Sequence, residues 1–187
     1  MKIASFLFGK YVKFKEMEKI TIINNLPVKR WKEYRDLQIE AHKESPLAFS
    51  ETLSELRKTS LKDWQKDLKD SLKNKTVIFF ALDGEKLIGM VDFHIHRLSK
   101  LKHNAFLGGL YVRKEYRGKG IGKSLTQKII DVARAKKAKN IFSEIIETQT
   151  ASIELHKKLG FKIVGKLENF LKDGNKYHSE FFLQKKL

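Results

Sequence analysis

The chain has no cysteine, only two prolines, and no apolar run long enough to cross a membrane. The absence of cysteine excludes disulfide bonds, thiolate zinc sites and thiol nucleophiles. The apolar stretch within residues 1–16 is interrupted by lysines and falls short of the ~20 residues that span a bilayer. No small-residue cleavage site of a signal peptide follows it. We therefore expect a cytoplasmic protein with no membrane attachment.

No repeat, low-complexity tract or linker divides the 187 residues, and this length suits one domain with one hydrophobic core. Met17 stands just before a strand-like run, Lys19–Ile23, which resembles the natural start of a domain. We predict that residues 17–187 form a single domain. Residues 1–16 are then an N-terminal extension that the domain does not need.

The formal net charge is +17, which raises the possibility of a nucleic-acid-binding module. Lysine supplies most of this charge and is spread along the chain. Arginine, in contrast, is the residue favoured for bidentate contacts to phosphates and bases. A solvated lysine-rich surface is the simpler interpretation, so we expect no nucleic-acid partner. Such a surface would still attract an anionic ligand.

Hydrophobic periodicity predicts helices in the first third of the chain and mostly strands after it. Pro27 and Pro46 flank the first helix, and Leu61, Trp64 and Leu68 are expected on one face of the third. The second and third helices are predicted at Ser50–Lys58 and Ser60–Leu72. Further helices are predicted around Ile121–Ala133 and Ser152–Leu159. Strands are predicted at Thr76–Leu82, Leu87–His96, His103–Val112, Ile141–Ile146, Phe161–Lys166 and Tyr177–Gln184. This order indicates a mixed α/β or α+β domain around one sheet.

A glycine-rich segment, Arg117-Gly118-Lys119-Gly120-Ile121-Gly122-Lys123, follows the strand that ends at Val112 and opens a helix. Closely spaced glycines let backbone N–H groups converge on a ligand. The helix N-terminus adds free N–H donors and partial positive charge. The segment therefore predicts a site for phosphate oxygens, although a plain strand-to-helix turn has the same appearance.

Two other phosphate-binding motifs do not fit this segment. A nucleotide-binding P-loop needs a glycine five residues before Gly122, where Arg117 stands. The dinucleotide fingerprint needs wider glycine spacing than Gly118, Gly120 and Gly122 provide, and a preceding βαβ unit.

Residues 117–122 resemble the Arg/Gln-x-x-Gly-x-Gly/Ala pyrophosphate loop of the GNAT superfamily of acyl-CoA-dependent N-acyltransferases. A second motif of that family, a helix followed by Gly-Phe and a strand, is matched by Ala151–Phe161. The resemblance covers about residues 19–187. It implies a mostly antiparallel central sheet of about seven strands with helices on both faces, in the order β-α-α-β-β-β-α-β-α-β-β. It also implies acetyl transfer from acetyl-CoA to an amine in a ternary complex, without a metal.

The resemblance further implies which residues bind acetyl-CoA. Backbone groups of Leu110 and Val112 pair with the pantetheine arm, the Val112 N–H polarises the thioester carbonyl, and the glycine loop holds the pyrophosphate. A bulge at Gly108-Gly109 opens the sheet for this ligand. The implied binding residues are Leu110, Tyr111, Val112, Arg117, Gly118, Lys119, Gly120, Ile121, Gly122, Lys123, Gln149 and Ser152.

Acetyl transfer needs a group that takes a proton from the amine and favours one that returns a proton to the thiolate. The resemblance makes Glu144 the candidate base, with an exposed strand carboxylate as the alternative. His156 stands where the family usually has tyrosine, and it is the candidate acid, with a packing role as the alternative. Gln149 replaces a common asparagine, and Ser152 and His156 together resemble the phosphinothricin-type members.

Several points stay open at this stage. His94 and His96 alternate along one strand, but without a third ligand they predict packing or an acceptor cleft, not a metal site. Nothing identifies the acceptor amine. A homodimer is plausible by resemblance alone, and a domain that binds acyl-CoA without catalysis is a further alternative.

Overall fold

The computed structural model describes residues 20–72 and 76–187, so the predicted extension at residues 1–16 lies outside the described residues. Seven strands form one sheet in the order β1-β2-β3-β4-β5-β7-β6. Among these strands only β4 and β5 pair in parallel, which confirms the predicted mostly antiparallel sheet. The strands are β1 Ile20–Asn24, β2 Val77–Asp83, β3 Lys86–Ile95, β4 Asn104–Val112, β5 Asn140–Ile146, β6 Lys162–Asp173 and β7 Lys176–Lys186.

Five α-helices occur in the described chain, and three of them precede β2, as the hydrophobic periodicity predicts, where the resemblance implied two. The five are α1 Trp31–Glu44, α2 Leu53–Leu56, α3 Leu61–Leu72, α4 Ile121–Ala135 and α5 Thr150–Lys158. Short 3-10 turns lie in the connections between elements: η1 Val28–Arg30, η2 Pro46–Ala48, η3 Ser99–Leu101 and η4 Lys114–Tyr116. No helix of the described residues has the length and apolar character needed to pass through a bilayer.

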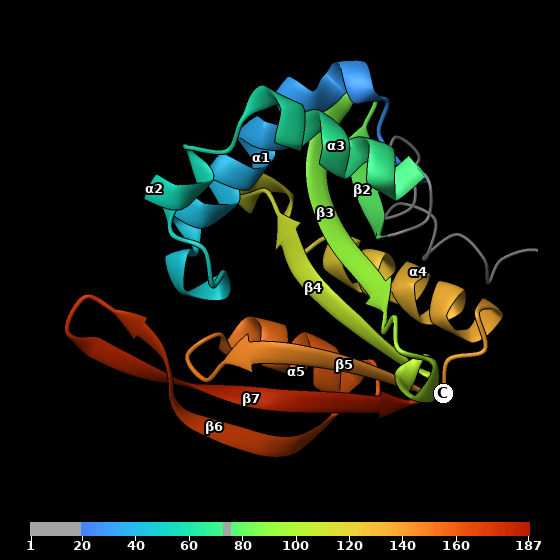
Figure 1. Ribbon diagram of the computed structural model, residues 1–187, viewed down its shortest axis with the longest axis vertical. Coiled ribbons are helices and arrows are strands. Elements are labelled where there is room, and N and C mark those ends of the chain that lie inside the picture. The colour runs from blue at the N-terminus through green and yellow to red at the C-terminus, as the bar shows by residue number, and fades with distance from the viewer. Residues whose placement is uncertain (1–19, 73–75) are drawn as a thin grey trace, which may run out of the picture.

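The sheet separates two hydrophobic cores, and β2 contributes to both. Its run Val77–Leu82 is buried on both faces, as its continuous apolar sequence indicates. Val77, Phe79 and Ala81 pack toward α4. Ile78, Phe80 and Leu82 pack toward α1 and α3. Figure 1 shows α1–α3 on one side of the sheet and α4 on the other.

The parallel strands β4 and β5 are paired over a short stretch and then separate. They pair only at Asn104–Phe106 with Asn140–Phe142, and beyond Phe106 the edge of β4 that faces β5 has no strand partner. Figure 1 shows the two strands close together near the C-terminus and separated at their other ends. The register with β3 shifts between Met90 and Asp92, where β4 holds an extra residue, and Gly109 has φ +57. This confirms the bulge predicted at Gly108-Gly109, which bends β4 away from β5.

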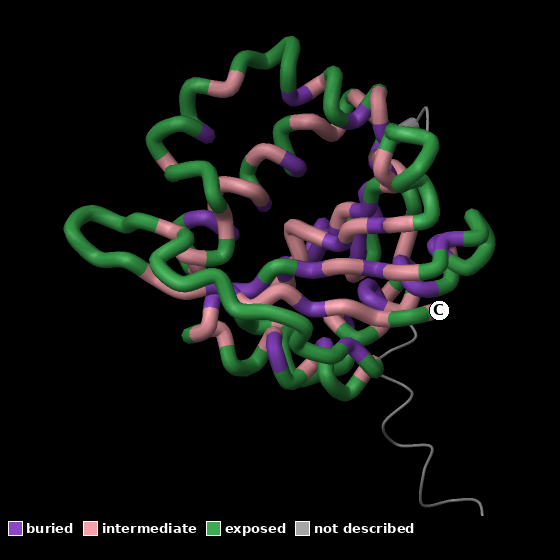
Figure 2. The backbone as a smooth tube through the Cα atoms, turned by 60° about the horizontal axis from the view of Figure 1, so that its bottom comes forward, coloured by how far each residue is buried: buried purple, intermediate pink, exposed green. Residues whose placement is uncertain are grey.

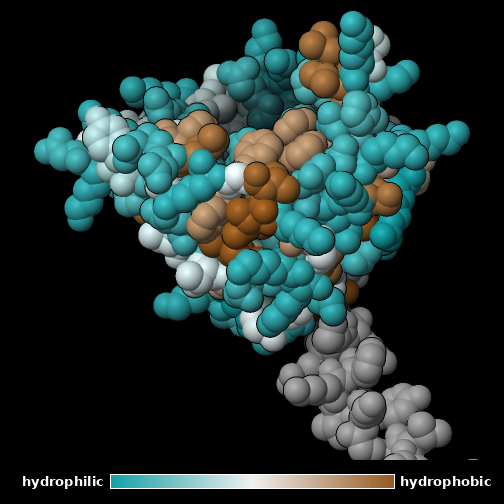
Figure 3. Space-filling view, turned by 90° about the horizontal axis from the view of Figure 1, so that it is seen from below, coloured by the Kyte–Doolittle hydropathy of each residue, from teal (hydrophilic) through white to brown (hydrophobic). Residues whose placement is uncertain are grey.

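The hairpin of β6 and β7 forms the far edge of the sheet. β6 extends beyond the predicted Phe161–Lys166, and all but one of its residues are exposed. The hairpin projects to one side of the molecule in Figure 1, and its tip is exposed in Figure 2. Seen from below the view of Figure 1, the surface shows an apolar area surrounded by hydrophilic side chains (Figure 3). Exposed apolar side chains of β6 are Ile163, Val164, Leu167 and Phe170.

Candidate active site

The glycine loop has the backbone conformation that the sequence predicted. Gly118 and Gly120 have φ +76 and +81, a left-handed region that L side chains rarely adopt, and Gly120 is the N-cap of α4. Open space lies where a Cβ at either position would point. The first turn of α4 carries no acidic residue. Free N–H groups therefore face open space at a helix start, as an anion site requires.

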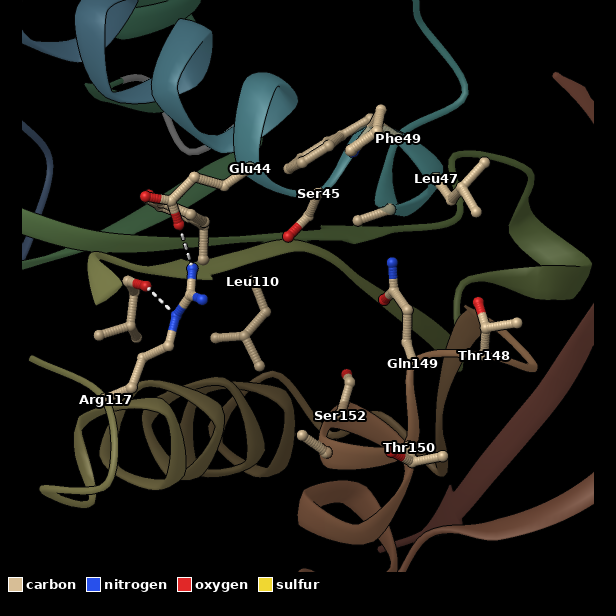
Figure 4. Close-up of a pocket in the computed structure, with 15 residues that line it drawn as sticks. Glu44, Ser45, Leu47, Phe49, Leu110, Arg117, Thr148, Gln149, Thr150 and Ser152 are labelled. Carbon is tan, nitrogen blue, oxygen red and sulfur yellow. Dashed lines mark hydrogen bonds and ion pairs between the residues drawn. The ribbon is translucent and has the colours of Figure 1, made fainter. Parts of the chain in front are cut away.

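Two cavities adjoin this loop, and we call them together the groove. One, of about 600 Å³, lies between the start of α4 and α5. The other, of about 500 Å³, lies between the end of α1, the turn Pro46–Ala48, the end of β4 and the start of α5. Leu110, Val112, Arg117 and Ser152 line both, so the cavities share a wall where β4 separates from β5. Figure 4 shows the second cavity, into which Ser45, Gln149 and Ser152 point.

All the predicted binding residues except Lys119 line the groove. Those that line at least one of its cavities are Leu110, Tyr111, Val112, Arg117, Gly118, Gly120, Ile121, Gly122, Lys123, Gln149 and Ser152. Lys119 is exposed, with its ammonium 5.4 Å from the centre of the Tyr116 ring. The Tyr111 side chain is buried in the core under α1, where its hydroxyl donates to Glu40 at 3.0 Å. Tyr111 therefore offers the groove mainly its backbone.

Arg117 is the most strongly held cation in the groove. Its Nε donates to the carbonyl of Val112 at 2.8 Å, and its guanidinium pairs with Glu44 at 2.6 Å (Figure 4). The guanidinium also lies 5.5 Å from the centre of the Tyr111 ring. These contacts join the end of α1 to the end of β4, and they hold positive charge at the wall common to both cavities.

Glu144 lies on the sheet face that α4 and α5 do not cover. Its cross-strand partner is Phe182, and Glu180 pairs with Ile146 two residues further along β5, so both carboxyl groups share one face. Glu144 is exposed, whereas Glu180 is 9% exposed and its Oε2 has no hydrogen-bond partner. Burial, and then the charge of Glu144, raises the pKa of Glu180. Sequence reasoning missed Glu180, because it stands among the apolar residues of a strand without a motif.

His156 points into the protein. It is 1% exposed, packs against Phe161 with ring centres 5.0 Å apart, and its Nδ1 lies 2.8 Å from the Ser152 carbonyl. Since a carbonyl only accepts, Nδ1 carries the proton, and the buried Nε2 has no partner. Burial lowers the pKa of His156, which favours the neutral ring. Neither His156 nor Glu144 is among the residues that line the groove.

His94 and His96 belong to an aromatic row on the sheet. His94 stacks on Phe106 at 5.1 Å, and His96 lies tilted against the same ring. Phe142 and Phe182 continue this row across β5 and β7. Within residues 20–72 and 76–187 no group of three or more His, Asp or Glu side chains is arranged to hold a metal ion.

Sequence reasoning also missed Asp92, an acidic residue inside the apolar strand β3. It borders a third cavity, on the α1 side of the sheet, together with Gly109 of the β4 bulge. Burial raises the pKa of Asp92 to about 6. The sequence signal was the single carboxylate in the run Leu87–Phe93, where every other position is apolar or glycine.

Comparisons with known proteins bear directly on this site. A family model described as the acetyltransferase (GNAT) family matches residues 31–161. The N-alpha-acetyltransferase 30 of Schizosaccharomyces pombe is 35% identical over 85 residues, covering 44% of this chain and 55% of that protein. The L-methionine sulfoximine/L-methionine sulfone acetyltransferase of Pseudomonas paraeruginosa is 43% identical over 58 residues, covering 31% of this chain and 34% of that protein.

The fold is similar to that of solved acetyltransferases. The GNAT superfamily phosphinothricin acetyltransferase from Sinorhizobium meliloti, solved in complex with AcCoA, superposes with a TM-score of 0.77 at 21% identity. The match covers 90% of this chain and 89% of that one, and at this identity it speaks for the fold. The chain spans about half, or less, of the length of the two curated relatives above.

Proposed function

The chain belongs to the acetyltransferase (GNAT) family, and we propose that it transfers an acetyl group from acetyl-CoA to a primary amine by direct transfer in a ternary complex. One observation carries this proposal. The unpaired edge of β4 leads directly to the glycine-lined start of α4, and a groove lies along both. Such an arrangement suits an extended ligand that ends in a diphosphate.

Individual residues of the groove would hold acetyl-CoA as follows. The N–H groups of Gly120, Ile121 and Gly122 donate to the pyrophosphate, with Lys123 nearby as a mobile charge. Leu110 and Val112 offer backbone groups to the pantetheine amides, as a neighbouring strand would. Bound there, acetyl-CoA supplies the activated acetyl group. The Val112 N–H is the donor we assign to the thioester oxygen.

The chemistry then requires a neutral amine. The amine nitrogen forms a bond to the acetyl carbon, the carbon–sulfur bond breaks, and the thiolate leaves with the electron pair. The proton that the nitrogen loses as the amide forms passes to the thiolate and gives the free thiol of CoA. Before the attack, a carboxylate takes the proton that the ammonium form must lose. We propose Glu144 for this step, because it lies on the open face of the sheet and its strand ends at the groove. Glu180, on the same face, is the second carboxylate to test.

We propose a packing role for His156 and not the role of general acid. A buried ring with a lowered pKa is neutral near pH 7, and a neutral imidazole is a poor proton donor. Its side chain fixes α5 against Phe161, and this helix in turn presents Ser152 and Gln149 to the groove. His156 thus acts on the site through the helix that carries it.

Release of free thiol from acetyl-CoA, followed across a panel of amines, tests the proposed activity. Thiol release that depends on an amine supports acetyl transfer. Binding of acetyl-CoA without thiol release for any amine would instead support a non-catalytic acyl-CoA-binding domain.

Variants of the two candidate catalytic residues separate their roles. Glu144→Gln is expected to lower kcat by about 100-fold or more with little change in acetyl-CoA affinity. Glu147→Gln, beside it but paired with Lys166 at 2.9 Å, is the matched control. His156→Leu, of similar volume, is expected to keep kcat within about tenfold and leave the pH profile unchanged. Unchanged turnover in Glu144→Gln, with a loss in Glu180→Gln, would move the base to Glu180.

A further inference from the structure

A separate acidic cavity lies on the α1 side of the sheet, next to the groove. Its volume is about 360 Å³. Three carboxyl groups line it: Asp92 from β3, Asp67 from α3 and Glu51 from the loop before α2. The chain has 39 Lys and Arg residues against 22 Asp and Glu, yet no Lys or Arg lines this cavity. A locally negative cavity in a strongly basic protein attracts a cation.

Asp92 is the inner carboxylate of this cavity. It is only partly accessible, and among the described residues it has no hydrogen-bond or ion-pair partner. The bulge of β4 makes room for it, because a Cβ at Gly109 would lie 2.5 Å from its Oδ2. An unpaired carboxylate in a low-dielectric place is unfavourable by itself, and a positively charged ligand beside it would offset this cost.

Aromatic rings form part of the remaining wall, beside Gln38, Ser50, Leu56 and Thr59. Tyr34 and Trp64 lie edge to face at 5.6 Å, and Phe49 stacks on His42 at 4.0 Å. All four side chains line the cavity. Aromatic faces attract ammonium groups, and together with a carboxylate they favour an organic cation over a hydrated metal ion.

The acidic cavity and the groove have a wall in common. Phe49 lines both, and Gly109, which lines the cavity, is the neighbour of Leu110, which lines the groove. The two cavities are therefore neighbours, and an acceptor that occupied both would have to cross the boundary at Phe49. One end would lie beside the β4 edge where we place the thioester, and the other beside Asp92.

We propose that this cavity binds a second, non-reacting ammonium group of the acceptor, so that the preferred acceptor class is an aliphatic diamine. This inference rests on the proposed acetyl transfer. It assigns to Asp92 the recognition of the distal charge, with Asp67 and Glu51 at the exposed mouth guiding the cation in. Because both ends are fixed, activity has an optimum of chain length between the two amines.

Matched acceptors test the proposal. The values of kcat/KM are measured for diaminobutane, for butylamine, and for a homologous series of α,ω-diamines. The wild-type protein is expected to prefer diaminobutane over butylamine by about tenfold or more. Asp92→Asn is expected to remove this preference through KM, leaving butylamine unchanged. Asp36→Asn, an exposed carboxylate on α1, is the control and leaves both acceptors unchanged.

The outcomes separate the two proposals. Equal kcat/KM for diamine and monoamine, or an equal loss of both in Asp92→Asn, would overturn the diamine pocket and leave acetyl transfer standing. If neither amine is acetylated, calorimetric titration with diaminobutane alone still tests the cavity. Saturable binding that Asp92→Asn abolishes supports it, and no binding to the folded wild-type protein overturns it.

Discussion

Single residues with unusual backbone or charge determine how this site works. Gly120 starts α4 in a left-handed conformation, and Gly84 in the β2–β3 turn has φ +57 with equally open surroundings. The two positions therefore share one backbone requirement, but only Gly120 faces the groove. This pair separates the effect of backbone strain from the effect on ligand binding.

Gly120→Ala and Gly84→Ala are expected to lose similar stability, about 1–2 kcal/mol each, because alanine is strained at positive φ. Only Gly120→Ala should also weaken acetyl-CoA binding, by about tenfold or more, since its methyl group enters the space for phosphate oxygens. Urea unfolding and calorimetric titration measure the two effects. Equal loss of affinity in both variants would show that strain alone, not position, explains it.

Asp92 is predicted to oppose folding at neutral pH. Its folded pKa of about 6 lies above the ordinary value of 3.8, so the folded state binds this proton more tightly than the unfolded state. The groups that face it are Asp67, Glu51, Tyr34 and His42. The stability that the folded state gains from binding this proton at Asp92 is fully present below about pH 4, and it is lost as pH rises through about 6.

Asp92→Asn is accordingly expected to be more stable than wild type at about pH 8, by on the order of 2 kcal/mol, and to lose this advantage near pH 4. Urea unfolding at several pH values measures the difference. An advantage that is constant with pH would indicate that ionisation of Asp92 is not its cause. A gain in stability with a loss of diamine preference is the combination that a functional carboxylate predicts.

At the scale of elements, the separation of β4 from β5 is the feature that makes a binding edge. Hydrogen exchange tests whether acetyl-CoA completes this edge. Binding is expected to slow exchange at the amides of β4 beyond Phe106 and at the start of α4, while the paired strands β1 and β2 stay unchanged. Protection spread evenly over the sheet would contradict pairing of the ligand with β4.

The sequence predicted elements with strong local signals and missed those fixed by distant contacts. The element order, the bulge and the glycine loop follow from local patterns. The second helix, predicted at Ser50–Lys58, spans only Leu53–Leu56, because a capping box starts it at Thr52 and a new cap at Ser60 begins α3. Helical spacing groups Leu61 with Trp64 and Leu68 on one face of α3, and of these three side chains Trp64 and Leu68 are buried whereas Leu61 is 54% exposed.

The candidate site also has parts that local sequence patterns predicted and parts that depend on contacts between distant residues. The groove is built from three continuous segments, residues 44–49, 110–123 and 148–158, and the motifs predicted lining residues in the second and third but none in the first. The acidic cavity combines single residues from α1, α3, β3 and β4, and no local pattern links Asp67 to Asp92. The inward orientation of His156 depends on how α5 packs on Phe161, which helical spacing alone does not determine.

For the whole molecule, the net charge of +17 predicts that salt weakens binding of an anionic ligand. The affinity for acetyl-CoA is expected to fall several-fold between roughly 0.05 and 0.5 M salt, because added ions screen the field. S-acetylpantetheine, which lacks the diphosphate, is the control and should show little change. A similar salt effect on both ligands would remove long-range charge as the explanation.

Acetyl-CoA binding at the junction of β4 and α4 is the central claim, and calorimetric titration of the full chain tests it most directly. We predict one bound molecule per chain, with affinity reduced in Gly120→Ala and unchanged in Gly84→Ala. The titration is run at two temperatures, so that a vanishing enthalpy at one of them does not hide binding. No heat at either temperature, with protein shown to be folded by circular dichroism, would contradict the account.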